Sequence, residues 1–308
     1  MKKRIQNKIA ERRWTLPIAL GYGILVAMIQ GLICKETILP IACVFLATLL
    51  MVEFNNRFAL IRIYSRMVST SFLLMTMMSP QLLSSPKACV AQVAFIGFYI
   101  IFFMGYQNRN AAGVMFYSFF IVGILSVLWV QALYFIPLLW IMMANNNMAG
   151  SIRNIMASIL GVMSPYWFLT PYYIYKGDLE QMWKHFVALG KFGAVASFSS
   201  YTTEQLCTLS IIITLFAIGT VHFVRSSYLD KIRIRMTYNT LIIAAVAAIV
   251  FLILQPQHYD MLIRIILVST AALIAHFFTL THTRFTNISF IAIVTGIILM
   301  TAYNLITA

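Results

Sequence analysis

Apolar segments about 20 residues long follow one another along almost the whole chain, with short polar clusters between them. A helix that crosses the hydrocarbon core of a bilayer needs about 20 mainly apolar residues. Hydrophobic residues make up 61% of the 308 positions and charged residues 10%, whereas soluble domains contain roughly 45–50% and 25%. The sequence therefore predicts an all-α fold, a polytopic transmembrane helix bundle that forms a single integral membrane domain over residues 1–308.

The length of the apolar segments predicts about eleven spans. They are residues 15–34, 38–54, 66–83, 88–106, 111–128, 130–144, 155–175, 206–224, 237–255, 262–281 and 288–306. Only Gln131 breaks the apolar character between the fifth and sixth spans, and Pro137 lies inside the sixth. Residues 111–144 are therefore either two spans or one kinked or re-entrant unit, which would leave ten spans.

The distribution of Lys and Arg predicts the orientation of these spans. With a cytoplasmic N-terminus and alternating spans, 16 of the 22 basic residues fall on the cytoplasmic side, which is the side that basic loops prefer. The six on the outer side are Lys35, Lys87, Lys176, Lys184, Lys191 and Arg264. This predicts a basic cytoplasmic N-terminus over residues 1–13 and an outer C-terminus. It also favours two separate crossings in 111–144, because a single crossing would reverse every later loop.

The formal net charge of +14 fits the same topology. Because the basic residues lie in short loops between apolar segments, they indicate contact with anionic phospholipid rather than with nucleic acid. One longer polar segment, residues 176–205, lies on the predicted outer side. Its apolar positions 179, 182, 186 and 189 are spaced three and four residues apart, which predicts an amphipathic helix on the outer membrane surface.

Ionisable side chains inside a membrane are costly and usually functional. All eight acids lie near the ends of the predicted spans or outside them, which weakens the case for an ion-coupled pump, because such transporters carry acids near the bilayer midplane. His276 lies well inside a span. It is a candidate substrate-binding residue, with hydrogen bonding between helices as the alternative.

The predicted outer face gathers the other candidates. The candidate catalytic residues are Glu36, Asp178, His258 and Asp260, and the candidate substrate-binding residues are Arg264, Lys87 and His276. Asp260 and Arg264 are four residues apart and share a helix face, so a structural ion pair is one interpretation. The other is that Arg264 and His258 bind an anionic headgroup while an outer carboxylate acts as general base.

Common catalytic motifs are missing from the sequence: it has no G-x-x-x-x-G-K-[ST], G-x-S-x-G or H-E-x-x-H. The four cysteines form no C-x-x-C pair. We therefore expect neither a metal nor a cofactor.

Two segments carry a resemblance. Asn154–Tyr173 contains Ser-Pro-Tyr-Trp-Phe-Leu-Thr-Pro-Tyr-Tyr, and Ala275–Asn287 begins Ala-His-Phe-Phe. With the basic N-terminus, they resemble an uncharacterised family of multi-pass inner-membrane proteins of Gram-negative bacteria, which implies a bacterial inner-membrane location. The architecture is also similar to that of glycosyltransferases that use lipid-linked sugars and of O-antigen polymerases. In the glycosyltransferases an acid in the first outer loop is typical, and Glu36 occupies that place.

Three functions follow from these features. The first is a non-enzymatic subunit of a membrane or envelope-biogenesis complex. The second is an enzyme that acts on a polyprenyl-linked glycan or a lipid at the outer leaflet. The third is a transporter of a small or lipidic solute. A polar central cavity that reaches His276 or Gln92 would favour the transporter, and a tightly packed bundle would favour the subunit.

Overall fold

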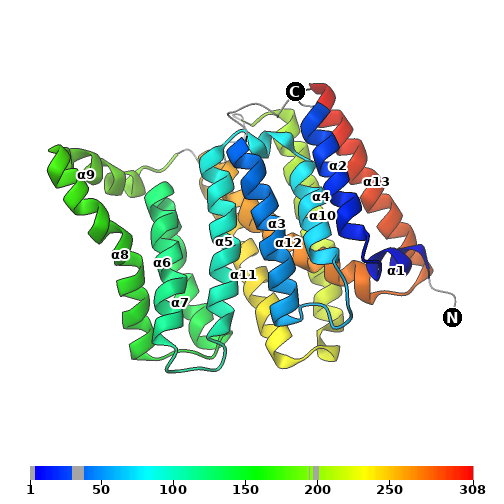
Figure 1. Cartoon of the computed structure of the whole chain (residues 1–308), viewed down its shortest axis with the longest axis horizontal. Coiled ribbons are helices and arrows are strands. Elements are labelled where there is room, and N and C mark those ends of the chain that lie inside the picture. Colours follow the sequence, from blue (N-terminus) through cyan, green and yellow to red (C-terminus); the bar gives the residue numbers. More distant parts are fainter. Residues whose placement is uncertain (1–3, 30–37, 194, 197–200, 308) are drawn as a thin grey trace. The chain divides into compact units, whose positions relative to one another are not determined.

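The computed structural model of the chain describes residues 4–29, 38–193, 195–196 and 201–307. Over these residues it contains thirteen α-helices and no strand, so the predicted all-α fold is confirmed. The chain divides into two compact units (Figure 1). Unit 1 is Met1–Val93 with Ser197–Ala308, and unit 2 is Ala94–Ala196. Helix α5 (Pro86–Met104) begins in unit 1 and ends in unit 2.

Among the described residues, six helices are long and apolar enough to cross a membrane, which makes this a multi-pass membrane protein. They are Ile38–Phe58 (α3), Pro86–Met104 (α5), Thr203–Leu229 (α10 with η6), Ile232–Leu254 (α11), Pro256–Leu280 (η7 with α12) and Arg284–Thr307 (α13). Four other predicted spans hold shorter apolar helices: Thr15–Ile29 (α2), Met67–Met77 (α4), Ala112–Leu128 (α6) and Val130–Asn145 (η3 with α7). Helix α8 (Ile152–Lys176) has 25 residues but is not among these apolar helices. The number eleven therefore stays a prediction.

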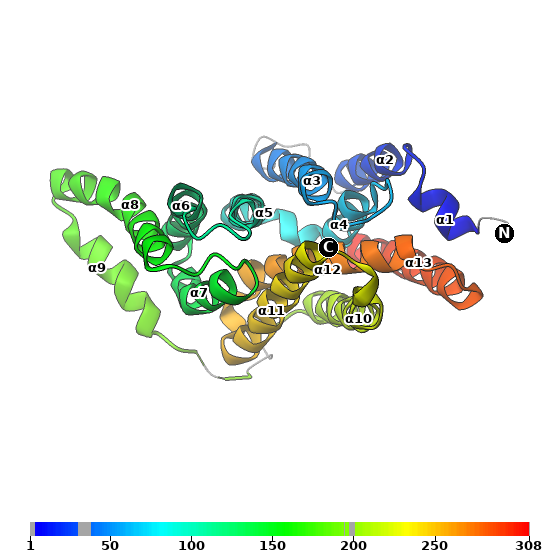
Figure 2. The same cartoon turned by 90° about the horizontal axis from the view of Figure 1, so that it is seen from below.

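Helix α12 (Tyr259–Leu280) is the centre of unit 1. Helices α4, α10 and α11 pack against it, and Figure 2 shows them beside it in the view from below. Within its most apolar stretch, 94% of the residues are buried. A helix that is apolar on all sides is stable only when other helices surround it, and α12 meets that condition through residues such as Ile266, Ala272 and Ile274.

Short segments that are distant in sequence meet at each end of unit 1. At one end, α1 (Ile5–Ala10) covers the carbonyl end of α12: Gln6 Nε2 donates to Phe278 O at 2.6 Å, and Asn7 Nδ2 donates to Thr281 O at 3.0 Å. These bonds satisfy carbonyls that a helix end leaves unpaired. At the other end, Asn304 Nδ2 donates to Met78 O at 2.8 Å. Gln6 N–H also donates to Asn287 Oδ1 at 3.1 Å, so α13 begins beside α1 and ends at the opposite end of unit 1.

In unit 2, α6 and the η3–α7 segment form a hairpin. The N–H of Gln107, before α6, donates to Asn147 O, after α7, at 2.9 Å. Ser151 Oγ donates to Arg109 O at 2.7 Å. The chain therefore returns to the end from which α6 began. Rises of 1.5 and 2.0 Å per residue give η3 and α7 a combined length of roughly 27 Å, close to the thickness of a bilayer core.

Helix α8 packs along α6 at very short range. A Cβ on Gly161 would lie 2.5 Å from Phe116 O, and a Cβ on Gly123 would lie 2.7 Å from Val162 O. Small residues allow two membrane helices to approach closely. The helix predicted within residues 176–205 is present as α9 (Leu179–Val187), extended by the 3-10 turn η4 (Ala188–Gly190). Its position on the outer membrane surface stays a prediction.

Candidate functional site

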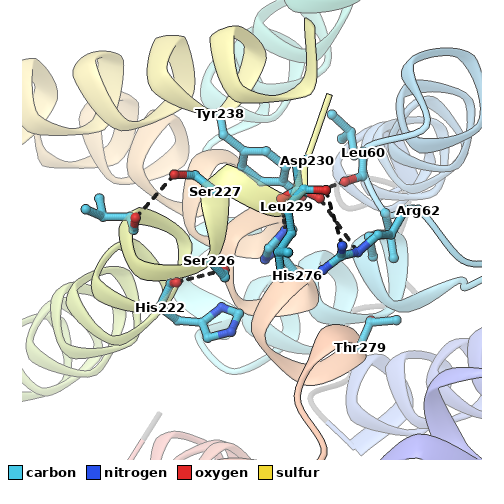
Figure 3. Close-up of polar contacts among 12 residues, drawn as sticks. Leu60, Arg62, His222, Ser226, Ser227, Leu229, Asp230, Tyr238, His276 and Thr279 are labelled. Carbon is cyan, nitrogen blue, oxygen red and sulfur yellow. Dashed lines mark hydrogen bonds and ion pairs between the residues drawn. The ribbon is translucent and has the colours of Figure 1, made fainter. Parts of the chain in front are cut away.

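Among the described residues of unit 1, His276 and Asp230 form a fully enclosed ionisable pair (Figure 3). His276 lies near the C-terminal end of α12, and Asp230 follows the turn η6 (Ser227–Leu229) before α11. Nε2 of His276 lies 3.0 Å from Oδ2 of Asp230, and the two side chains are 0% and 1% exposed. The main-chain N–H of Asp230 donates to Ser227 O at 3.0 Å, which closes the turn and directs the carboxylate inward. A carboxylate enclosed in this way needs a donor, and the imidazole provides it.

Arg62 links this pair to the surface. Its Nε lies 3.7 Å from Oδ1 of Asp230, and its side chain is 36% exposed. Its NH1 also donates to Leu229 O at 3.3 Å. The loop that carries Arg62 is held by Asn55, whose Nδ2 donates to Ser65 O at 3.0 Å and whose Oδ1 accepts from the N–H of Ile61 at 3.3 Å. Asp230 thus joins a buried imidazole to a partly exposed guanidinium.

Aromatic rings enclose His276 on its remaining sides. The ring centroid of His222, on α10, lies 5.5 Å from that of His276, and the centroid of Tyr238, on α11, lies 5.2 Å away. The Tyr238 hydroxyl points to Leu60 O and Ala272 O, at 3.4 and 3.3 Å. The Nδ1 atoms of both histidines are buried without a hydrogen-bond partner. Within unit 1 the cluster joins α10, α11, α12 and the loop after α3.

A second polar cluster surrounds Arg264 near the other end of α12. Arg264 is 0% exposed. Its NH1 donates to Gln92 Oε1 at 2.7 Å, its NH2 donates to Leu82 O, and its Nε donates to the main-chain carbonyl of Asp260 at 3.0 Å. The fixed fork of guanidinium donors suits three acceptors in different directions. Arg264 therefore joins α12 to α5 and to the 3-10 turn η2 (Pro80–Leu83).

The described candidate residues of unit 1 other than Arg264 and His276 differ in their exposure. Glu36 lies outside the described residues. Lys87 is exposed in the first turn of α5, Asp260 is exposed at the start of α12, and His258 is partly buried in η7 (Pro256–His258). Arg264 Nε bonds to the main-chain carbonyl of Asp260. One interpretation of the sequence had been an ion pair between Arg264 and the carboxylate of Asp260.

Tyr201 lies near the same end, outside the apolar helices. Its hydroxyl donates to Pro256 O at 2.7 Å. Burial, and then the charge of Asp260, raise the pKa of Tyr201 to about 12, so its hydroxyl stays protonated at neutral pH and remains a donor.

Asp178 belongs to unit 2, where it has a local structural role. Its carboxylate accepts from the N–H of Gln181 at 3.3 Å and thereby caps the N-terminus of α9. Aspartate at this position satisfies a free N–H and suits the helix dipole. Within the described part of the chain, no group of three or more His, Cys, Asp or Glu side chains is placed to hold a metal ion.

Asp230 and Arg62 are the charged residues of the cluster around His276, and the sequence did not suggest either of them. Both lie in segments predicted as cytoplasmic loops, where a charged residue is ordinary. The only available signal was His276 itself, because an imidazole inside an apolar helix requires a polar partner. Comparison with known proteins adds no further assignment: no family model, no curated protein and no solved structure matches the chain.

Proposed function

We propose that the chain is a non-enzymatic subunit of a membrane complex that serves envelope biogenesis. One observation carries this proposal. Arg264 and His276, the ionisable side chains beyond the first turn of α12, are both 0% exposed and bonded to the protein's own groups. An enzyme or transporter needs charged groups that a substrate can reach, whereas groups enclosed in this way hold helices together.

The surface of unit 2 supports a role in binding another membrane protein. Helix α8 turns one face to α6 and exposes large side chains on another, with Trp167 and Phe168 each 75% exposed. Beside them lies an apolar cleft of about 270 Å³, lined in part by Phe116 and Leu160. Interfaces between proteins are enriched in aromatic residues. We place the partner's helix on this face of α8.

The proposal includes a location and an orientation. The chain lies in a bacterial inner membrane, crosses it eleven times, and has its N-terminus in the cytoplasm and its C-terminus outside. The excess of Lys and Arg on one side supports this orientation. In this orientation the His276–Asp230 end of unit 1 faces the cytoplasm, and its basic loops contact anionic phospholipid.

A crosslinking experiment in native membrane tests the subunit proposal. A photo-reactive amino acid is placed at Phe168 and, as a control, at Leu299, which is 65% exposed on α13 of unit 1. Particles excised with native lipid are then weighed by native mass spectrometry. We expect one protein adduct at Phe168, none at Leu299, and particles heavier than one chain. Single chains with only lipid adducts would overturn the proposal. Turnover of a polyprenyl-linked sugar by such single chains would establish the enzyme alternative.

A further inference from the structure

A second apolar cleft lies in unit 1, between α2, α4 and α13. Its volume is about 270 Å³. Its floor is buried, with Ala19 at 4%, Met75 at 0% and Ile297 at 4% exposure. Its rim is open, because Ile18 on α2 is 70% exposed and Ile298 on α13 is 47% exposed. The cleft therefore opens sideways between α2 and α13, toward the surroundings of these apolar helices.

The cleft suits a narrow apolar occupant. Along α2 it extends from Thr15 to Tyr22, which is roughly 10 Å at 1.5 Å per residue. Its volume is just below the usual range for small-molecule pockets, roughly 300–1,000 Å³. Most of its hydroxyls are already used: Thr15 Oγ1 donates to Ile9 O at 2.6 Å, and the Tyr22 hydroxyl donates to Thr301 Oγ1 at 2.6 Å. Ser71 Oγ alone among the lining groups is buried without a partner.

One end of the cleft is strongly basic. Arg13 precedes the lining residue Thr15 by two positions, and Arg66 directly precedes the lining residue Met67. Both guanidinium groups lie against the ring of Tyr64, at 6.0 and 5.7 Å from its centroid. Residues 4–13 contain four cations, Arg4, Lys8, Arg12 and Arg13, and one acid, Glu11.

The basic end also carries a marker of the membrane–water boundary. Trp14 is 72% exposed at the start of α2, and exposed Trp and Tyr side chains collect at the level of lipid headgroups. The cations and the aromatic side chains thus lie at one end of the cleft, and its apolar part leads away from them along α2. This is the order of groups in a phospholipid: a charged phosphate and then an apolar chain.

We propose that unit 1 has a specific site for an anionic phospholipid, with one acyl chain in the cleft and the phosphate at Arg13 and Arg66. Charge complementarity selects this occupant over a second protein helix, because a net-cationic end adjoins a small apolar cleft. The inference rests on the proposed location in a bilayer but not on the proposed complex, since the site lies within one chain.

The test measures lipid binding to the isolated chain. Delipidated protein in detergent is titrated with phosphatidylglycerol or phosphatidylcholine of identical acyl chains, and bound lipid is counted by native mass spectrometry. We expect one tightly held phosphatidylglycerol and at least a tenfold weaker affinity for phosphatidylcholine. Val294→Trp places a large ring in the cleft and should weaken both lipids at least tenfold. Arg13→Gln with Arg66→Gln should abolish the preference for phosphatidylglycerol.

Matched controls keep the proposal falsifiable. Leu299→Trp adds the same ring to α13 outside the cleft, and Arg57→Gln with Lys231→Gln removes two exposed cations that do not line it; both should bind like the native chain. If Val294→Trp does not fold, Ile18→Trp at the open rim replaces it. Three results would each overturn the proposal. The native chain could bind the two lipids with equal affinity, the cleft variants could bind lipid as tightly as the native chain, or a second copy of the chain could occupy the cleft. If the chain binds the lipid but the crosslinking experiment finds no protein partner, only the subunit proposal is contradicted.

Discussion

The carboxylate of Asp230 lies 3.0 Å from Nε2 of His276, although 46 residues separate them in the sequence. The contact depends on two local features. The turn η6 ends α10 so that Asp230 points inward, and α12 places His276 one turn before its own C-terminal end. Arg62 binds the other carboxylate oxygen from a third segment. Three segments of unit 1 therefore share one buried acid, so the loss of this acid should affect the whole unit.

Replacement of Asp230 by Ala should destabilise unit 1. The change leaves Nε2 of His276 without an acceptor and Arg62 without its counter-charge. An unsatisfied buried group costs about 1–3 kcal/mol, and the loss of one member of a buried ion pair costs about 3–5 kcal/mol. Asp230→Asn should cost less, because its amide oxygen still accepts a hydrogen bond. Equilibrium unfolding in mixed micelles measures both free energies.

The control for this variant is Glu53→Ala, which removes an exposed acid from α3 of the same unit. Its effect on the free energy of unfolding should stay within about 0.5 kcal/mol, as for most surface substitutions. Equal stability of Asp230→Ala and Glu53→Ala would show that the Asp230–His276 contact contributes nothing to the fold.

Arg264 and Gln92 should be energetically coupled. Arg264 donates to Gln92 Oε1 at 2.7 Å in a fully enclosed setting. Hydrogen bonds to charged groups contribute about 1.5–3 kcal/mol. A double-mutant cycle with Arg264→Met and Gln92→Leu should therefore give a coupling free energy in that range. Independent effects of the two changes would mean that Arg264 is held mainly by the carbonyls of Leu82 and Asp260.

Substitution of Gly161 by Ala should disrupt unit 2. The added Cβ would lie 2.5 Å from Phe116 O and 3.0 Å from Phe120 N, both main-chain atoms of α6. Neither atom can move without displacing the helix, and overpacking of this kind costs about 1–3 kcal/mol. Gly113→Ala is the matched control on α6, because nothing lies within 4 Å of its added Cβ. Thermal unfolding should place the Gly161 variant well below the native chain and the Gly113 variant at or above it.

The sequence predicted the helices better than it predicted which of them is central. Apolar length located a helix in each of the eleven predicted spans, because bilayer thickness and backbone hydrogen bonding restrict both the length and the type of a span. The same criterion cannot separate a lipid-facing helix from an enclosed one, since both are apolar. The central position of α12 depends on contacts with α4, α10 and α11, and these are not encoded in the pattern of any single segment.

The candidate site was predictable only in part. His276 stood out because it is an imidazole inside an apolar segment, and it does lie at a polar cluster. Its partners could not be deduced, because the side-chain direction of Asp230 depends on the turn before it and that of Arg62 on bonds to Asn55. The i,i+4 spacing correctly placed Asp260 beside Arg264, but the main chain of Asp260 rather than its carboxylate makes the contact.

The hairpin of unit 2 allows the proposed topology to be tested directly. Asn110 precedes α6 and Asn145 ends α7, and both are exposed. Because Gln107 N and Asn147 O are hydrogen-bonded, the two positions lie at the same end of the hairpin, whereas Lys176 lies at the far end of α8. In a chain without its native cysteines, Asn110→Cys and Asn145→Cys should react with an impermeant thiol reagent only after the inner membrane is opened. Lys176→Cys should react in intact spheroplasts. If Asn110→Cys and Asn145→Cys were labelled from opposite sides, two crossings in residues 111–144 would be excluded. If instead Asn110→Cys and Asn145→Cys reacted in intact spheroplasts and Lys176→Cys reacted only after the membrane was opened, the N-terminus would lie outside.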